Sequence, residues 1–341
     1  MPTFNKPAKK KKTWTRIVIL LVICVLRYIW GKGFSLDANI KILPWNTIST
    51  ILKPLSSRNQ TRLKVYIKTH HIDFSQLEPG TYDFSGHYSK SQFIKTILAG
   101  PSNKYIKITV LEWRSIYDID ASLTKKWIIN QGEYIALVTD PTIIAKYQAK
   151  YPFLSNISIP LTTLEGFLYP DTYNTDAGNN IVDQLVFLQL ENFKTKVRDA
   201  HQAEISSTNR YQNMILASIV EKEERNNANK ATVAGIFFKR LQIWMKLDAD
   251  ITLCYGLHET YASCTPSVIA KNISDKSNPY NTRQNGWLPP QPISNPTVES
   301  IVAVLHPQAS DYLYYLHGSD GTIHYASTLE EHNANKAQYL K

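Results

Sequence analysis

Glu221 is the residue whose type and setting in this sequence are best suited to proton transfer. It lies at the polar end of the segment Met214–Arg225, in which aliphatic side chains recur at the i, i+1, i+4 and i+5 positions of one buried helix face. On that helix Glu221 shares a face with Ala217 and Ser218, whose small side chains leave room for a ligand. Apolar surroundings disfavour the charged form of a carboxyl group, so such a group can hold a proton near neutral pH. We therefore predict that Glu221 is a general acid.

The charges around Glu221 also have a simpler interpretation. Residues 221–225 read Glu-Lys-Glu-Glu-Arg, and charge runs of this kind usually form the solvated end of a helix. Glu223 lies two residues beyond Glu221 and projects from another part of the helix, so we interpret it as a supporting or solvated charge. The two interpretations differ in whether Glu221 is buried.

Length and composition indicate an ordered globular protein. The 341 residues are enough for two domains, and 43% of them are hydrophobic while 19% are charged. The net charge of +10 is concentrated at the N-terminus, because residues 1–33 hold eight of the 38 Lys and Arg residues and none of the 28 acidic ones. The rest of the chain is nearly neutral. We therefore expect no nucleic-acid partner.

The N-terminus has the pattern of a membrane anchor. Residues 1–13 form a basic tail, and 14–31 are predicted to be a single transmembrane helix, because the run Trp14–Trp30 is largely apolar. That run spans roughly 26 Å at about 1.5 Å per residue, slightly short of a typical hydrocarbon core. The lysines at 9–12 predict a cytoplasmic N-terminus and an exported body at the cytoplasmic (inner) membrane. A cleaved signal peptide is the competing interpretation, and the lack of a clear small-x-small site favours an uncleaved anchor.

The three cysteines leave their own roles open. Cys24 lies in the predicted anchor, whereas Cys254 and Cys264 are ten residues apart in the exported body, where a disulfide is allowed but not required. Cys254 and His258 have the spacing of half a metal site, but no convincing second pair accompanies them. We predict no metal and no cofactor.

The exported body mixes strand and helix patterns, so we predict an α+β fold. Alternating polar and apolar residues predict strands at Arg62–Lys68 and Tyr105–Leu111, with a helix at Ser89–Leu98 between them. The segment Pro160–Tyr173 is rich in Gly, Pro and aromatic residues and marks a boundary between two units, placed at 61–155 and 156–341. The second unit is expected to hold three long helices and a hairpin, at about 181–205, 209–225, 228–245 and 312–325.

Five motifs occur in the order found in a known enzyme family. They are Leu164-Glu-Gly-Phe-Leu-Tyr-Pro-Asp-Thr-Tyr173, Ala217-Ser-Ile-Val-Glu-Lys-Glu223, Val233-Ala-Gly-Ile-Phe-Phe-Lys-Arg-Leu241, Tyr280-Asn-Thr282 and Leu288-Pro-Pro290. The closing segment continues the match with Leu305-His-Pro307, Tyr312-Leu-Tyr-Tyr315 and His332-Asn333. Over most of its length the chain thus resembles the MltG (YceG-like) endolytic murein transglycosylases.

The resemblance implies both an architecture and an activity. The architecture is a single membrane anchor, a small LysM-like glycan-binding domain at 61–155 and a mixed α/β catalytic domain at 156–341. The activity is endolytic cleavage of the MurNAc–GlcNAc bond of peptidoglycan, which leaves 1,6-anhydro-MurNAc ends and helps to terminate nascent strands without a cofactor. The glutamate of the Ser-Ile-Val-Glu-Lys-Glu motif is the family's catalytic acid, and we place Glu221 there. Glycan strands and peptidoglycan synthases are the implied partners.

Four further residues are candidate substrate contacts, namely Glu165, Asp250, Tyr280 and Asn281. Glu165 is either a second carboxylate in the cleft or a side chain that binds the amides of its own loop. Asp250 and Asn281 either contact sugar hydroxyls or organise turns. Tyr280, together with Trp287, either stacks on a sugar face or packs within its loop.

The sequence departs from the family pattern at several positions. Leu111-Glu-Trp-Arg114 replaces Pro-Glu-Gly-Trp, Asp248 and Ile251 replace Gln and Pro, and Arg283 replaces a tyrosine. Trp287 and Gln291 replace two glycines near the expected cleft, where their side chains fill space that is open in relatives.

Two other functions remain as alternatives. One is a non-catalytic glycan-binding or scaffold protein of the cell-wall synthesis machinery, in which the changes at Trp287 and Gln291 mark a lost activity. The other is a pyridoxal-phosphate lyase, a label that some members of this family have carried. The predicted export of the body argues against it.

Overall fold

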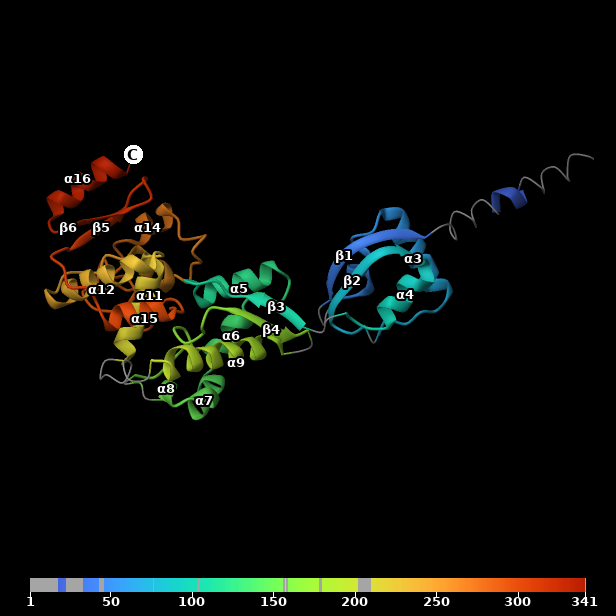
Figure 1. Cartoon of the computed structure of the whole chain (residues 1–341), viewed down its shortest axis with the longest axis horizontal. Coiled ribbons are helices and arrows are strands. Elements are labelled where there is room, and N and C mark those ends of the chain that lie inside the picture. Colours follow the sequence, from blue (N-terminus) through green and yellow to red (C-terminus); the bar gives the residue numbers. More distant parts are fainter. Residues whose placement is uncertain are drawn as a thin grey trace, which may run out of the picture. The chain divides into compact units, whose positions relative to one another are not determined.

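The computed structural model describes residues 18–340 apart from 23–32, 43–45, 76, 103–104, 156, 158, 178–179 and 202–209. The chain divides into two compact units (Figure 1). One comprises the residues up to Ile106 with 176–179, and the other comprises 107–175 with 180 to the end. This division lies well before the boundary near residue 155 expected from the sequence. Residues 107–155 belong to the second unit because their helices pack within it, as where the Tyr134 hydroxyl donates to the Gln189 side chain at 2.8 Å.

The first unit is an antiparallel strand pair with three helices. β1 (Phe34–Ile42) pairs with β2 (Gly80–Tyr88), so that Phe34 lies opposite Tyr88. The helices are α2 (Ile48–Leu52), α3 (Ser57–Thr69) and α4 (Lys90–Leu98). The core is apolar and aromatic, and the rings of Phe84 and Phe93 lie 4.9 Å apart within it.

Helix α3 shows that one sequence prediction was wrong. The segment Arg62–Lys68 was expected to be a strand, but it is helical. Leu63 and Ile67 fit an alternating pattern, yet they are also four residues apart and therefore share one face of a helix. Leu63 is fully buried and Ile67 packs against the core. The predicted helix at Ser89–Leu98 is confirmed as α4, which begins with a reciprocal capping box between Ser89 and Gln92.

The second unit begins with short helices and most of a strand pair, of which Tyr105, Ile106 and Asp176 are counted in the first unit. β3 (Tyr105–Thr109) confirms the strand predicted there and pairs with β4 (Thr172–Asp176). The helices between them are α5 (Ile116–Lys125), α6 (Glu133–Thr139), α7 (Pro141–Lys150) and α8 (Pro152–Ser155). Helix α9 (Ile181–Phe193) follows and continues as a π-helical segment, Lys194–Asp199.

The remainder of the second unit is a helix bundle with a C-terminal hairpin. Helices α11 (Arg210–Glu223), α12 (Asn227–Gln242) and α15 (Val298–Leu305) lie side by side in Figure 1. The other elements are α13 (Asp250–Gly256), α14 (Pro266–Asn272), β5 (Tyr314–His317), β6 (Ile323–Ala326) and α16 (Leu329–Tyr339). The helices predicted at about 209–225 and 228–245 and the hairpin are confirmed, whereas the helix predicted at about 181–205 is α-helical only to Phe193 among the described residues. The aliphatic face of α11 is buried, as its period predicted.

The transmembrane part of the predicted fold class requires correction. Among the described residues, none of the helices combines the length and the hydrophobicity needed to cross a bilayer. Most of the expected anchor at 14–31 lies outside the described residues, and only 18–22 are described, as helix. The described fold is therefore mixed α/β without a membrane-spanning helix.

Candidate active site

Glu221 lies in the last turn of α11 and is buried between three helices. Its Oε2 atom accepts hydrogen bonds from the Thr297 amide at 3.1 Å, Thr297 Oγ1 at 3.0 Å and Ser300 Oγ at 2.6 Å. Lys230 Nζ forms an ion pair with the same oxygen at 3.2 Å, and both charged side chains are only 2% exposed. Glu221 therefore joins α11 to α12 and α15, and its carboxylate is closed to solvent.

Glu223 ends α11 and directs its carboxyl group toward the C-terminal hairpin. The Tyr315 hydroxyl on β5 donates to Glu223 Oε2 at 2.9 Å, and His317 Nε2 lies 3.0 Å from the Glu223 carbonyl oxygen. Neighbouring protein atoms displace water from the carboxyl group and raise its pKa, the Tyr315 hydrogen bond lowers the pKa in part, and the charge of Asp250 raises it further. Glu223 nevertheless keeps partial exposure. It is thus a carboxyl group of raised pKa on a residue that is only partly buried.

Asp250 begins α13 and lies close enough to Glu223 for its charge to affect that carboxyl group. The Arg283 guanidinium binds both Asp250 oxygens: Nε contacts Oδ1, and Nη2 lies 3.0 Å from Oδ2. The two side chains are 33% (Arg283) and 37% (Asp250) exposed, so this pair remains open to solvent. The structure brings the predicted contact Asp250 together with Glu223 and not with Glu221.

Glu165 is fully buried and binds loop atoms. It accepts hydrogen bonds from the Ile116 amide at 2.8 Å and from the Asn295 side-chain amide at 2.6 Å. Burial raises the pKa of Glu165 to about 8, although the Ile116 hydrogen bond and the charge of Lys222 oppose this rise. Lys222 itself forms an ion pair with buried Asp118 at 3.4 Å. Of the two roles considered for Glu165, the geometry favours the one that organises loops.

Asn281 also binds its own loop, whereas Tyr280 lies beside it with partial exposure. The fully buried Asn281 side chain donates to the carbonyl oxygens of Ile273 at 3.2 Å and Asp275 at 2.7 Å, so its amide hydrogens are already engaged. The Tyr280 ring lies 5.1 Å from that of Tyr255, centroid to centroid. Tyr280 thus packs in the loop and remains partly exposed.

The two residues that replace family glycines differ in their surroundings. Trp287 is 64% exposed, and Gln291 is 6% exposed with its side-chain amide donating to Thr162 Oγ1. Only Trp287 therefore presents a side chain to a ligand in solution.

A disulfide decides between the alternatives left for the cysteines. Cys254 and Cys264 are bonded to each other, with their Cα atoms 5.7 Å apart. Cys254 is therefore not available as a metal ligand beside His258, whose ring stacks on Tyr117 at 4.9 Å. In the described part of the chain, no group of three or more His, Cys, Asp or Glu residues could hold a metal ion.

Comparison with known proteins places these features in a family. The YceG-like family model matches residues 40–338, which include every carboxylate described above. The chain belongs to the YceG-like family. It is similar to an endolytic murein transglycosylase of Bacillus subtilis, with 27% identity over 324 residues that cover 91% of this chain and 86% of the relative.

A second relative and a solved structure agree with this assignment. An endolytic murein transglycosylase of Streptococcus pneumoniae is 26% identical over 293 residues, which cover 79% of this chain but only 52% of that longer protein. A crystal structure of a YceG-like protein from Listeria monocytogenes superposes with a TM-score of 0.66 at 27% identity, covering 87% of this chain and 98% of the other.

Within this YceG-like chain, the two glutamates of one sequence motif have different surroundings, and the catalytic role predicted for Glu221 stays a prediction. The motif Ala217-Ser-Ile-Val-Glu-Lys-Glu223 contains two glutamates, and the apolar pattern correctly indicates that the first is buried. The Glu221 side chain is only 2% exposed, whereas Glu223 is partly exposed. The position of Glu223 as the last residue of the helix was a signal, because a helix end borders a loop and the surface.

Proposed function

We propose that this YceG-like protein is a lytic transglycosylase that cleaves peptidoglycan strands internally. Membership of the family and the likeness to the murein transglycosylases of Bacillus and Streptococcus support the reaction class. The observation that carries the chemistry is the setting of Glu223, a partly exposed residue whose carboxyl group is desolvated and accepts a hydrogen bond from the Tyr315 hydroxyl.

We assign the proton transfer to Glu223 in place of Glu221. A general acid must reach the oxygen that it protonates, within about 3 Å, in the bound complex. Glu221 is 2% exposed and its Oε2 atom already has four donors from Lys230, Thr297 and Ser300. Glu223 has one side-chain donor, and burial raises its pKa, which favours the protonated form that a general acid needs.

The reaction then needs one carboxyl group acting twice. Glu223 gives its proton to the glycosidic oxygen as the bond from MurNAc C1 to that oxygen breaks, so GlcNAc leaves with a free hydroxyl group. The C6 hydroxyl of the same MurNAc attacks C1, and its proton returns to the Glu223 carboxylate. The product ends in 1,6-anhydro-MurNAc and no water is consumed, in contrast to the two-carboxylate scheme of most glycoside hydrolases.

The neighbouring residues would hold the sugars. The Asp250–Arg283 pair offers acceptors and donors to sugar hydroxyls next to Glu223. Tyr280 is partly exposed and supplies an aromatic ring of the kind on which a sugar can pack. Glu165 and Asn281 would act indirectly by fixing the loops that carry this surface.

The setting of the enzyme follows from its substrate and its disulfide. Peptidoglycan lies outside the cytoplasmic membrane, and a disulfide such as Cys254–Cys264 persists in oxidising compartments. We infer that the catalytic unit works there, with peptidoglycan synthases as partners that supply nascent strands. We also infer that the first unit, with its β1–β2 pair and three helices, is a LysM-like module that binds glycan.

Mass spectrometry of a digest of purified glycan strands tests the proposal. Strands shortened to fragments with 1,6-anhydro-MurNAc ends would support it. Reducing MurNAc ends as the main product would show that water is the nucleophile. Strands that bind but keep their length would favour a scaffold protein.

A further inference from the structure

We propose that Arg225, Trp113 and Tyr261 form a subsite for a carboxylate of the stem peptide that peptidoglycan carries on MurNAc. This inference rests on the proposed function and extends it from the glycan backbone to its peptide. The subsite lies outside the Glu223–Asp250 surface, in the part of the second unit where the loop after α13 meets the segment between β3 and α5.

The three side chains form a compact cluster of one cation and two aromatic rings. The Arg225 guanidinium carbon lies 4.5 Å from the centroid of the Trp113 ring and 5.7 Å from that of Tyr261. The two rings meet edge to face with centroids 5.0 Å apart. Arg225 is exposed and Tyr261 is 46% exposed, so a ligand can reach the guanidinium while it rests on the rings.

The backbone holds both rings in place. Trp113 has a left-handed φ of 56°, an uncommon conformation for a residue with a bulky side chain, and it begins the turn into α5. The amide of Tyr261 donates to buried Asp118 Oδ1 at 2.8 Å. Neither anchor uses a polar atom of Arg225, so both rings are held in place without an ion pair or hydrogen bond to the guanidinium.

The charges near the cluster leave Arg225 available. Among the described residues, no carboxylate forms an ion pair with Arg225. Its neighbour Glu224 accepts instead from the Asn226 amide at 2.6 Å and from the Asn229 side chain at 3.2 Å. Arg114, whose guanidinium carbon also lies 4.1 Å from the Trp113 centroid, is by contrast paired with Asp118 at 3.3 Å.

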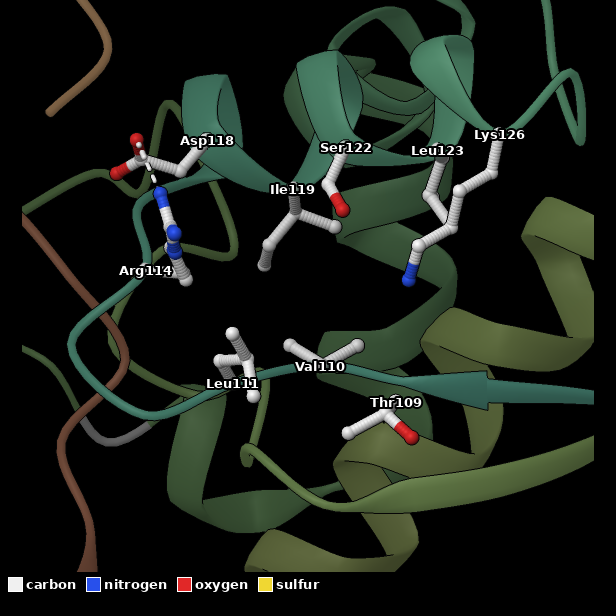
Figure 2. Close-up of a pocket in the computed structure, with 9 residues that line it drawn as sticks. All are labelled: Thr109, Val110, Leu111, Arg114, Asp118, Ile119, Ser122, Leu123 and Lys126. Carbon is white, nitrogen blue, oxygen red and sulfur yellow. Dashed lines mark hydrogen bonds and ion pairs between the residues drawn. The ribbon is translucent and has the colours of Figure 1, made fainter. Parts of the chain in front are cut away.

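Figure 2 shows the surroundings of Arg114. The Arg114 guanidinium points to Asp118 at one side of a small pocket, and much of the remaining lining is apolar. These apolar residues are Val110, Leu111, Ile119 and Leu123. Arg114 is thus held within the protein and adds positive potential next to the cluster, while Arg225 remains free to form a bidentate pair with a ligand carboxylate.

The position of the cluster next to Glu223 suits the stem peptide, which branches from the same polymer that Glu223 would cleave. Arg225 follows Glu223 by two residues, so their Cα atoms lie within about 7 Å of each other. Helix α13 connects Asp250 at its start to the loop that carries Tyr261, so the same helix links the two surfaces. A MurNAc held for cleavage at Glu223 would therefore extend its acidic stem peptide within reach of the cluster.

A binding experiment tests this without requiring turnover. The full-length Glu223→Gln protein is titrated with a soluble disaccharide that carries a stem peptide, the same disaccharide without peptide, and a version whose peptide carboxyl groups are amidated. We expect the acidic peptide to improve Kd about tenfold, as a charge-assisted pair allows, and amidation to remove the gain. Arg225→Gln in the same protein should abolish the difference, whereas Lys271→Gln, which removes an exposed cation on α14, should leave it unchanged.

Two results would overturn the inference. One is a peptide-bearing ligand that binds no better than the bare disaccharide, and the other is an Arg225→Gln change that weakens both ligands equally. Neither result concerns cleavage, so the proposed reaction stands or falls separately in the product assay on the unmodified protein.

Discussion

Removal of the Glu221 side chain should destabilise the second unit strongly, whatever its effect on activity. A Glu221→Leu change leaves Lys230 without its partner at a site where that lysine is only 2% exposed. Truncating one member of a buried ion pair costs about 3–5 kcal/mol. The Thr297 amide and the Ser300 hydroxyl also lose their acceptor, and each unsatisfied donor adds about 1–3 kcal/mol, though not additively. We therefore expect a loss of at least about 4 kcal/mol.

Urea unfolding of the full chain, followed by tryptophan fluorescence, measures this loss. The double change Glu221→Leu with Lys230→Met supplies the control, because replacing both members of a buried pair by apolar groups is often close to neutral. The double variant should recover much of the stability lost by the single one. An unfolding midpoint for Glu221→Leu equal to that of the unchanged protein would refute the reasoning, and so would a double variant less stable than the single one.

Three further outcomes follow from the same contacts. Folding raises the pKa of Glu165 from 4.5 to about 8, so the folded state binds more protons than the unfolded state between these pH values. The free energy of unfolding should therefore fall as pH rises through this range, and Glu165→Gln should flatten the decline. The Tyr315 hydrogen bond lowers the pKa of Glu223, so Tyr315→Phe should move the alkaline limb of the kcat/KM profile to higher pH; an unmoved limb would mean that another group sets it. Replacing Cys254 and Cys264 by serine should cost about 3 kcal/mol of unfolding free energy by the loop-entropy estimate, and added reductant should destabilise only the unchanged protein.

The long helices of the second unit could be predicted from the sequence because their apolar period persists over three or more turns. The strand predicted at Arg62–Lys68 was wrong because seven residues can satisfy two periods at once, and tertiary packing of Leu63 decided for the helix. The unit boundary was placed near residue 155 because the Gly- and Pro-rich segment is conspicuous, whereas packing of α6 against α9 is invisible in a local pattern.

The candidate site could be located from the sequence but not resolved. The apolar run of α11 correctly predicts that Glu221 is buried, yet nothing local distinguishes a buried acid that reacts from one that joins helices. The distinction comes from Ser300 and Tyr315, which are 79 and 92 residues away from the glutamates that they bind. The disulfide was left open for the same reason, since spacing alone does not fix the distance between two cysteines.

The most direct test compares Glu223→Gln with Glu221→Gln in cleavage of purified glycan strands, with the folded fraction of each measured by urea unfolding. We predict that Glu223→Gln stays as stable as the unchanged protein or gains stability, because an amide replaces a desolvated carboxyl group, and loses about 10²–10⁴-fold or more in kcat. Glu221→Gln should lose stability, while the protein that remains folded should cleave at a rate close to normal. Efficient cleavage by Glu223→Gln, together with a folded but inactive Glu221→Gln, would contradict the assignment and return the proton transfer to Glu221.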